Sequence, residues 1–162
     1  MKKIIIIRGP LGVGKTTVAK KLAEKIDAKY FSVDEILENQ ALDKIEGESI
    51  TLESFTKVND LMIPEIEAVL AQDKAAIIDG NFYFQEVIDD LQARLSVQPK
   101  VFTLTASVDT CIGRDCDRGQ THGADAARAV HSMVSKVEAG ETIITEGKIA
   151  DEIVTELLKK ID

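Results

Sequence analysis

The chain has 162 residues, of which 44% are hydrophobic and 30% charged, and its formal net charge is −8. This length and composition are typical of one globular domain, and they exclude a collagen-like, fibrous or intrinsically disordered chain. Acidic and basic residues are interspersed, and their acidic balance disfavours a broad surface for nucleic acid or for an anionic membrane. We therefore expect a single domain over residues 1–162 with no membrane partner, and nucleic acid is disfavoured as a partner. We also expect a monomer or weak homodimer.

The amino-terminal apolar run and the two cysteines bear on where the protein is found. The run Ile4–Ile7 is too short for the apolar region of a signal peptide or for a membrane span. Cys111 and Cys116 are five positions apart, so on one helix they point in different directions and are predicted to stay reduced. Both observations favour a cytoplasmic protein.

Short apolar runs alternate with amphipathic stretches along the chain, which is the pattern of a parallel sheet covered on both faces. The predicted strands are residues 4–7, 30–33, 75–80, 101–105 and 142–145. The predicted helices are residues 15–26, 51–71, about 87–95, 107–118, about 127–137 and 149–161. Pro64 is expected to kink or split the second of these helices, because proline removes a helix hydrogen bond. The pattern predicts a three-layer α/β/α domain with a five-stranded parallel sheet.

The segment that follows the first predicted strand fits the pattern G-x-x-x-x-G-K-[ST] over residues 9–16. Glycines at 9, 12 and 14 let the backbone curl so that successive N–H groups point at phosphate oxygens, and the helix that follows adds its positive end. Lys15 can reach the β- and γ-phosphates, and the Thr16 hydroxyl can bind Mg²⁺. We therefore expect ATP and Mg²⁺ as cofactors. The nucleotide is expected to be held by Gly9, Gly12, Val13, Gly14, Lys15, Thr16 and Thr17, and by Arg118 further along the chain.

Two aspartates lie at the carboxyl ends of predicted strands and are expected near the phosphates, since ligands of open α/β sheets bind there. Asp34, after residues 30–33, could accept the proton of an acceptor hydroxyl; the alternative is a helix N-cap. Asp79 could hold Mg²⁺ through a water, together with Thr16, although Asp-Gly is also a common turn signal.

Three arginines flank a glycine-bounded segment that we interpret as a lid over residues 114–128. Arg114 and Arg118 are four positions apart on a predicted helix and Arg128 lies in the next one, with the flap 119–123 between them. Arginines on such a flap can close over a phosphoryl group in transfer, where a positive charge contributes roughly 10³-fold or more. The alternative is a solvated helix face on which neighbouring aspartates are the ion partners.

These residues resemble the small P-loop kinases of the shikimate, gluconate and nucleoside-monophosphate kinase type over essentially the whole chain. The chain is most similar to the chloramphenicol-phosphotransferase-like and polynucleotide-kinase-like ATP-binding proteins, through Val33-Asp34, the Cys-x-x-Arg-Asp run 111–115 and the pair Val130-His131. The resemblance implies that Asp34 is the general base and that Lys15 and Thr16 bind ATP and Mg²⁺. It also implies that Arg114 or Arg118 is the lid arginine.

The segment after the third predicted strand departs from these families. Nucleoside-monophosphate kinases have Asp-Gly-Phe-Pro-Arg there and shikimate kinases a glycine triplet, whereas this chain has Asp-Gly-Asn-Phe-Tyr at 79–83. Neither substrate therefore carries over. Asn81 and Tyr83, with Arg128, are the candidate acceptor-binding residues besides Asp34 and Asp79, although Phe82 and Tyr83 could equally belong to the core.

An insertion at about 39–71 lies where these kinases place their acceptor-binding helices, and its first part carries more acidic than basic residues. A neutral or cationic acceptor with a hydroxyl group is therefore expected. The prediction is an ATP- and Mg²⁺-dependent kinase for the hydroxyl of a small molecule. Two alternatives stay open: a nucleoside-monophosphate or polynucleotide 5′-end kinase, and a nucleotide-binding regulatory module with little or no catalysis.

Overall fold

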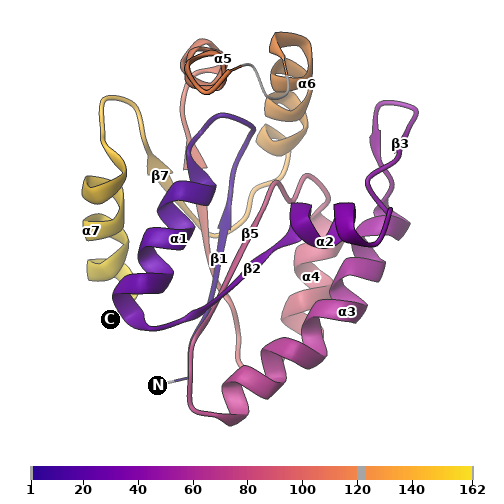
Figure 1. Ribbon diagram of the computed structural model, residues 1–162, viewed down its shortest axis with the longest axis vertical. Coiled ribbons are helices and arrows are strands. Elements are labelled where there is room, and N and C mark those ends of the chain that lie inside the picture. The colour runs from indigo at the N-terminus through magenta and orange to yellow at the C-terminus, as the bar shows by residue number, and fades with distance from the viewer. Residues whose placement is uncertain (1, 120–122, 162) are drawn as a thin grey trace.

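The computed structural model describes residues 2–119 and 123–161. Its main sheet has five parallel strands in the order β2-β5-β1-β6-β7 (Figure 1), which confirms the predicted fold class. The strands are β1 (Ile4–Arg8), β2 (Lys29–Ser32), β5 (Ala76–Gly80), β6 (Lys100–Thr105) and β7 (Glu141–Ile144). Because β1 is the middle strand, the turn that follows it lies at the centre of the carboxyl edge of the sheet.

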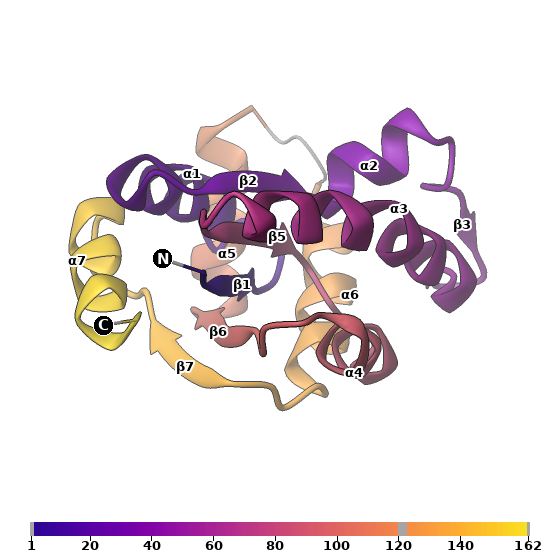
Figure 2. The same cartoon turned by 90° about the horizontal axis from the view of Figure 1, so that it is seen from below.

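The described residues form seven helices, and those on the two faces of the sheet complete the three layers (Figure 2). They are α1 (Lys15–Ile26), α2 (Val33–Asn39), α3 (Leu52–Ala71), α4 (Gln85–Arg94), α5 (Val108–Asp117), α6 (Ala124–Ser135) and α7 (Ala150–Ile161). Figure 2 shows α1 and α7 on one face of the sheet and α3 and α4 on the other. The carboxyl ends of the strands, at the top of Figure 1, point toward α5 and α6.

The β-branched run of β1 explains why two separate cores form. Ile4 and Ile6 point to the side of α3 and α4, whereas Ile5 and Ile7 pack on the side of α1 and α7. Since side chains of a strand alternate between faces, a strand buried on both sides needs a continuous apolar run. All four isoleucines are at most 2% exposed, so each helix layer is anchored on the same strand.

The insertion holds a small element that the sequence analysis did not predict. Strands β3 (Ile45–Glu46) and β4 (Ser49–Ile50) pair antiparallel and form a separate two-stranded sheet. Helix α3 runs on from Leu52 to Ala71 through Pro64, so a split at this proline is wrong. Its buried face packs in the core with α4, and that packing stabilises the helix although Pro64 provides no N–H.

The second predicted strand ends one residue earlier than expected, and this moves Asp34. Strand β2 stops at Ser32, and Asp34 lies in the first turn of α2. Ser32 is the N-cap, since its side-chain oxygen accepts a hydrogen bond from Glu35 N at 3.2 Å. The alternative in which Asp34 caps this helix is therefore wrong. An acidic residue in the first turn is still favourable to the helix dipole.

Two remaining expectations concern the membrane and the lid. No helix in the described residues is both long enough and apolar enough to cross a bilayer. Of the predicted lid, α5 and α6 are described on either side, while residues 120–122 of the flap lie outside the described residues.

Candidate active site

The turn between β1 and α1 has the backbone shape that a phosphate-binding loop needs. Gly12 has a φ of 79°, and a Cβ added there would lie 2.1 Å from the carbonyl oxygen of Cys111, so no side chain fits. Gly14 is the N-cap of α1 with a φ of 97°. No acidic residue occupies the first turn of α1, so the positive end of this helix is available to an anion.

The two residues that follow this turn are placed differently. Lys15 is 6% exposed, and its ammonium makes no hydrogen bond or ion pair with any described residue. An ammonium held at a helix start without a protein partner is suited to phosphate oxygens. Thr17 is exposed, whereas Thr16 is half-buried and points toward the neighbouring strand β5.

Thr16 and Asp79 form the second part of the site. The Thr16 hydroxyl donates to Asp79 Oδ2 at 2.7 Å, and the Tyr30 hydroxyl donates to the same oxygen at 2.8 Å. Burial and the neighbouring Asp79 carboxylate raise the pKa of Tyr30, so its hydroxyl stays protonated and remains a donor. The sequence analysis missed Tyr30, because only the pairing of β2 with β5 brings it beside Asp79.

The hydroxyl and carboxylate of this pair fit a magnesium ion bound partly through water. Asp79 is 3% exposed, and its Oδ1 accepts no hydrogen bond from any described residue. Mg²⁺ prefers oxygen ligands, keeps several waters, and takes only one or two protein ligands beside phosphates. No group of three or more His, Cys, Asp or Glu residues that could hold a metal occurs in the described part of the chain.

A cavity of about 260 Å³ lies beside the glycine turn, and Leu11 of that turn is part of its wall. Asp34, Asn81 and Tyr83 also line it, so the structure brings three of the predicted acceptor-binding residues together. The remaining walls come from α2, the β3–β4 hairpin and α6. Because Leu11 belongs to the turn itself, a molecule in this cavity would lie next to a bound triphosphate.

The two aromatic residues that follow β5 have separate roles. Phe82 is 1% exposed and belongs to the core, with a φ of 50°. The ring of Tyr83 packs edge-on against Phe55 at 5.2 Å between centroids, and its hydroxyl accepts a hydrogen bond from Ile50 N at 3.2 Å. Burial raises the pKa of Tyr83. Tyr83 is thus both a core residue and a wall of the cavity, and it ties the hairpin to the segment after β5.

The first of the predicted lid arginines is engaged with the protein backbone. Arg114 Nη1 donates to the carbonyl of Val13 at 3.0 Å and to Thr145 Oγ1 at 2.9 Å, and Nη2 donates to the carbonyl of Thr145 at 3.0 Å. This guanidinium therefore links the glycine turn to the segment after β7. In this conformation the Nη1 and Nη2 donors of Arg114 are directed at Val13 of the glycine turn and at Thr145.

The other two arginines lie at the surface on either side of the flap. Arg118 is the C-cap of α5, and its side chain is 50% exposed and 4.0 Å from Asp115. Arg128 is on α6, and its side chain is 58% exposed and 3.5 Å from Asp125. The pair of Arg128 with Asp125 is that of a solvated helix face, whereas Asp115, the partner of Arg118, is buried.

Arg8 is a buried cation that the sequence analysis did not single out. It is 0% exposed, and its guanidinium donates to the carbonyls of Phe82, Val134 and Val137 and to Thr103 Oγ1, at 2.9–3.1 Å. Burial lowers its pKa to about 10. Arg8 thus joins the end of β1, just before the glycine turn, to the end of α6 and to the segment after β5 that lines the cavity beside Asp34.

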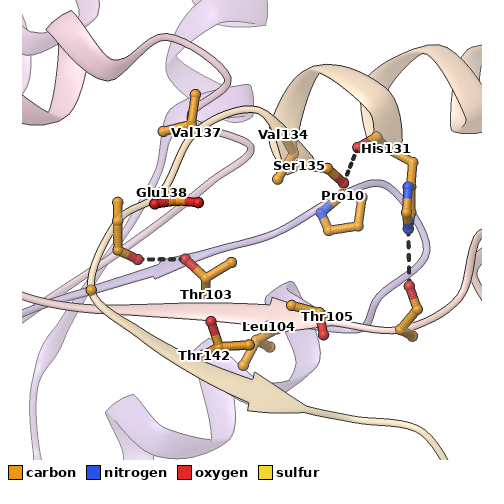
Figure 3. Close-up of a pocket in the computed structure, with 13 residues that line it drawn as sticks. Pro10, Thr103, Leu104, Thr105, His131, Val134, Ser135, Val137, Glu138 and Thr142 are labelled. Carbon is orange, nitrogen blue, oxygen red and sulfur yellow. Dashed lines mark hydrogen bonds between the residues drawn. The ribbon is translucent and has the colours of Figure 1, made fainter.

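A second cavity of about 620 Å³ lies between β6, β7 and α6 (Figure 3), and Asp34 is not among its lining residues. His131 Nε2 lies 2.9 Å from the carbonyl oxygen of Ala106 on its wall, and Thr103 donates to the carbonyl of Ala139 at 2.7 Å. Pro10 is the residue of the glycine turn that lines this second cavity. None of the predicted catalytic or nucleotide-binding residues lines this cavity.

The glycine turn and its lysine lie at the centre of the sheet edge, with a hydroxyl–carboxylate pair on one side and the cavity lined by Asp34 beside them. This fold and site define the class of small P-loop kinases, which are ATP-dependent phosphotransferases. The chain belongs to the family described as AAA domain, whose family model matches residues 4–139.

Two curated relatives illustrate the similarity in sequence. The chain is 31% identical over 167 residues to a Thermococcus kodakarensis protein named "Putative adenylate kinase", covering 98% of this chain and 85% of that protein. It is 29% identical over 123 residues to the shikimate kinase of Francisella tularensis subsp. novicida, covering 69% of this chain and 62% of that enzyme.

Two solved structures share the fold. A sugar kinase from Janibacter sp. superposes with a TM-score of 0.78 and 17% identity, covering 100% of this chain and 95% of that one. The tunicamycin resistance protein of Deinococcus radiodurans superposes with a TM-score of 0.74 and 19% identity, covering 99% of this chain and 96% of that one. At these identities the likeness concerns the fold alone.

Proposed function

We propose that the protein transfers the γ-phosphoryl group of ATP, bound with Mg²⁺, to a hydroxyl of a small molecule in the cavity beside Asp34. The observation that carries this proposal is that Leu11 of the glycine turn and Asp34 line the same cavity. A donor nucleotide and an acceptor would therefore meet at one place. The volume of about 260 Å³ suits a small molecule, since drug-sized ligands occupy roughly 300–1,000 Å³.

The nucleotide would be held by the turn and the start of α1. Backbone N–H groups of Gly9, Gly12, Val13 and Gly14 and the ammonium of Lys15 would bind phosphate oxygens, together with the first-turn residues Thr16 and Thr17. Mg²⁺ would be held by the Thr16 hydroxyl and, through water, by Asp79. The ion supplies neutralisation of phosphate charge when bound.

Asp34 would act on the acceptor. The acceptor oxygen forms a bond to the γ-phosphorus while the bond from that phosphorus to the bridging oxygen breaks, and ADP leaves. The acceptor hydroxyl loses its proton to the carboxylate of Asp34. Asn81 and Tyr83 would orient the acceptor in the cavity that they line.

Of the candidate arginines, Arg118 is the better candidate for the lid charge over the transferred group, and Arg128 the second. The support is that the Arg114 guanidinium already donates to two carbonyls and a hydroxyl, whereas Arg118 and Arg128 have half-exposed side chains. Arg114 would then act by holding the turn in its nucleotide-binding shape.

Three other functions compete with this one. A nucleoside-monophosphate kinase is favoured by the name of the Thermococcus relative, but a cavity with no basic side chain among its described lining residues has no partner for a monophosphate. A polynucleotide 5′-end kinase meets the same objection. In a regulatory module that binds nucleotide and transfers no phosphoryl group, the Asp34 carboxylate beside the glycine turn would have no catalytic role.

We also propose a cytoplasmic monomer or weak homodimer. The support is that Cys111 is buried and Cys116 exposed, with no disulfide between them, as a reducing compartment allows. Sedimentation at several protein concentrations measures the oligomeric state.

An acceptor panel tests the proposed transfer. ADP release from MgATP is measured with neutral, cationic and anionic hydroxyl compounds, with AMP included, and the phosphorylated product is identified by mass. The proposal expects strong stimulation by some hydroxyl compound. A flat response across the panel and across a small-molecule cell extract, with ATP binding intact, would leave the regulatory module as the function.

A further inference from the structure

The charged side chains that line the cavity beside Asp34 are all acidic among the described residues. Its charged lining residues are Asp34, Glu38, Asp43 and Glu48, and no lysine, arginine or histidine lines it among the described residues. Four carboxylates around a cavity of about 260 Å³ produce a negative potential inside it, because low-dielectric walls focus the field of the charges that line a cleft.

Three of these acids differ from acids elsewhere on the surface. The side chains of Glu38, Asp43 and Glu48 pair with no basic side chain in the described part of the chain. On the neighbouring helix α3, by contrast, Glu53 lies 2.8 Å from Lys57. Within the described residues, the charge of these three acids is therefore not compensated by a basic side chain.

A second observation, independent of the acids, points to a ligand that donates hydrogen bonds. Asn81 is 9% exposed and lines the cavity, and its Oδ1 accepts no hydrogen bond from any described residue. A buried carbonyl oxygen without a donor costs about 1–3 kcal/mol, so such groups are normally satisfied. A donor on a molecule in the cavity would satisfy it.

We propose that the acceptor carries a protonated amine besides its hydroxyl group, and that Glu38, Asp43 and Glu48 bind this ammonium while Asp34 takes the hydroxyl. The proposal rests on the proposed function, since it names the chemical class of the acceptor in that same cavity. An ammonium supplies both the positive charge that the three carboxylates lack and N–H donors for the oxygen of Asn81.

The transfer step leaves the amine untouched. The hydroxyl oxygen bonds to the γ-phosphorus, ADP leaves with the bridging oxygen, and the proton goes to Asp34. The product is an amine phosphate ester whose ammonium stays with the three carboxylates. Carboxylate and monophosphate acceptors are repelled by the same side chains.

The experiment compares acceptors that share a hydroxyl skeleton and differ in charge. The probes are glucosamine, N-acetylglucosamine, glucose and gluconate, and serinol, glycerol and glycerate, assayed by ADP release at low ionic strength where charge effects are least screened. The amine of each set is expected to have the highest kcat/KM, by about tenfold or more over its neutral counterpart. Added salt reduces this advantage.

Variants connect the preference to the three acids. Glu38→Gln, Asp43→Asn and Glu48→Gln are each expected to raise KM for the amine acceptor about threefold, and together to abolish the preference, with KM for ATP unchanged. Glu46→Gln is the matched control, because Glu46 is on the same hairpin and does not line the cavity. It is expected to behave as wild type.

The outcomes separate this inference from the proposed function. A neutral or anionic probe as the best acceptor, or a triple variant that behaves like Glu46→Gln, overturns the ammonium site and leaves the kinase intact. Where no probe is phosphorylated, γ-labelled ATP and a small-molecule extract replace the panel. A labelled product that fails to react with an amine reagent then overturns the inference, and the absence of any labelled product overturns the proposed function as well.

Discussion

The Thr16 hydroxyl donates a hydrogen bond of 2.7 Å to Asp79 Oδ2, which joins the first turn of α1 to the end of β5. The two residues are 63 positions apart in the chain. Their contact exists because β5 pairs directly with β1, in a register that places Ile7 opposite Asp79. The same carboxylate accepts from Tyr30 of β2, so one aspartate connects three elements at the edge where phosphates are expected.

Asp79→Asn tests the proposed role of this carboxylate. The substitution keeps the size of the side chain and removes its charge, so kcat should fall about tenfold or more and the Mg²⁺ concentration for half-maximal rate should rise. Steady-state rates over a Mg²⁺ titration measure both. Tyr30→Phe, which removes a hydrogen bond and leaves the carboxylate charged, should have a much smaller effect. An unchanged Mg²⁺ dependence in Asp79→Asn would assign Asp79 to the fold alone.

Asp34→Asn tests the proposed general base. The amide cannot take the acceptor proton, so the rate of transfer should fall by about 10²–10⁴-fold while the Kd for MgATP stays within about twofold. Turnover and calorimetric binding give the two quantities. Glu35→Gln is the control, because Glu35 lies in the same first turn of α2 and does not line the cavity. A parallel loss of binding and turnover would show that Asp34 supports structure.

Arg8→Met tests the buried cation. The carbonyls of Phe82, Val134 and Val137 would each lose a donor, and Val134 would keep only its bond from Val137 N. The other two carbonyls would be left unsatisfied at about 1–3 kcal/mol each, so the free energy of unfolding should fall by at least about 2 kcal/mol. Urea denaturation measures the loss. Arg94→Met removes a surface arginine that pairs with Asp60, and should cost no more than about 1 kcal/mol. Equal losses in the two variants would contradict a special role for Arg8.

Glu146 gives a prediction about pH. Hydrogen bonds from the Thr110 hydroxyl, the Ser107 amide and the Ser107 hydroxyl lower the pKa of Glu146 below its usual 4.5. The stability that a lowered carboxyl pKa contributes is present above the usual pKa and is lost as the pH falls through the lowered value. Glu146→Gln should therefore have a lower Tm than wild type at neutral pH, and the difference should shrink toward about pH 2.

The control for Glu146 is Glu138→Gln. Glu138 is exposed and makes no hydrogen bond or ion pair through its side chain with a described residue, so its substitution should leave Tm unchanged across the pH range. A Tm difference for Glu146→Gln that stays constant with pH would contradict the link to ionisation. Glu146 accepts a hydrogen bond from the hydroxyl of Ser107, the N-cap of α5. The same Tm measurements therefore also report on the stability of the start of this helix, which carries Arg114 and ends at Arg118.

The five strands, the glycine turn and most helices were readable from the sequence because each depends on a short stretch of chain. The four isoleucines of β1 predict a strand buried on both faces, and residues 9–16 predict the phosphate turn by their own residue types. The β3–β4 hairpin was missed, because each strand has only two residues and neither shows a clear periodicity. The boundary before Asp34 was missed because Ser32, one residue ahead of the expected end, caps α2.

The sequence by itself determined the class of fold and where a triphosphate is expected to bind. Only the tertiary structure decided that Arg8 is buried under α6 and that Arg114 donates to the glycine turn. It also decided that Glu38, Asp43 and Glu48 gather with Asp34 around one cavity that no basic side chain lines among the described residues. Local periodicity and turn chemistry act over a few residues, so they can be read in order along the chain. Burial, charge compensation and hydrogen bonding between residues 60–130 positions apart depend on how the layers pack, and no window of sequence contains that information.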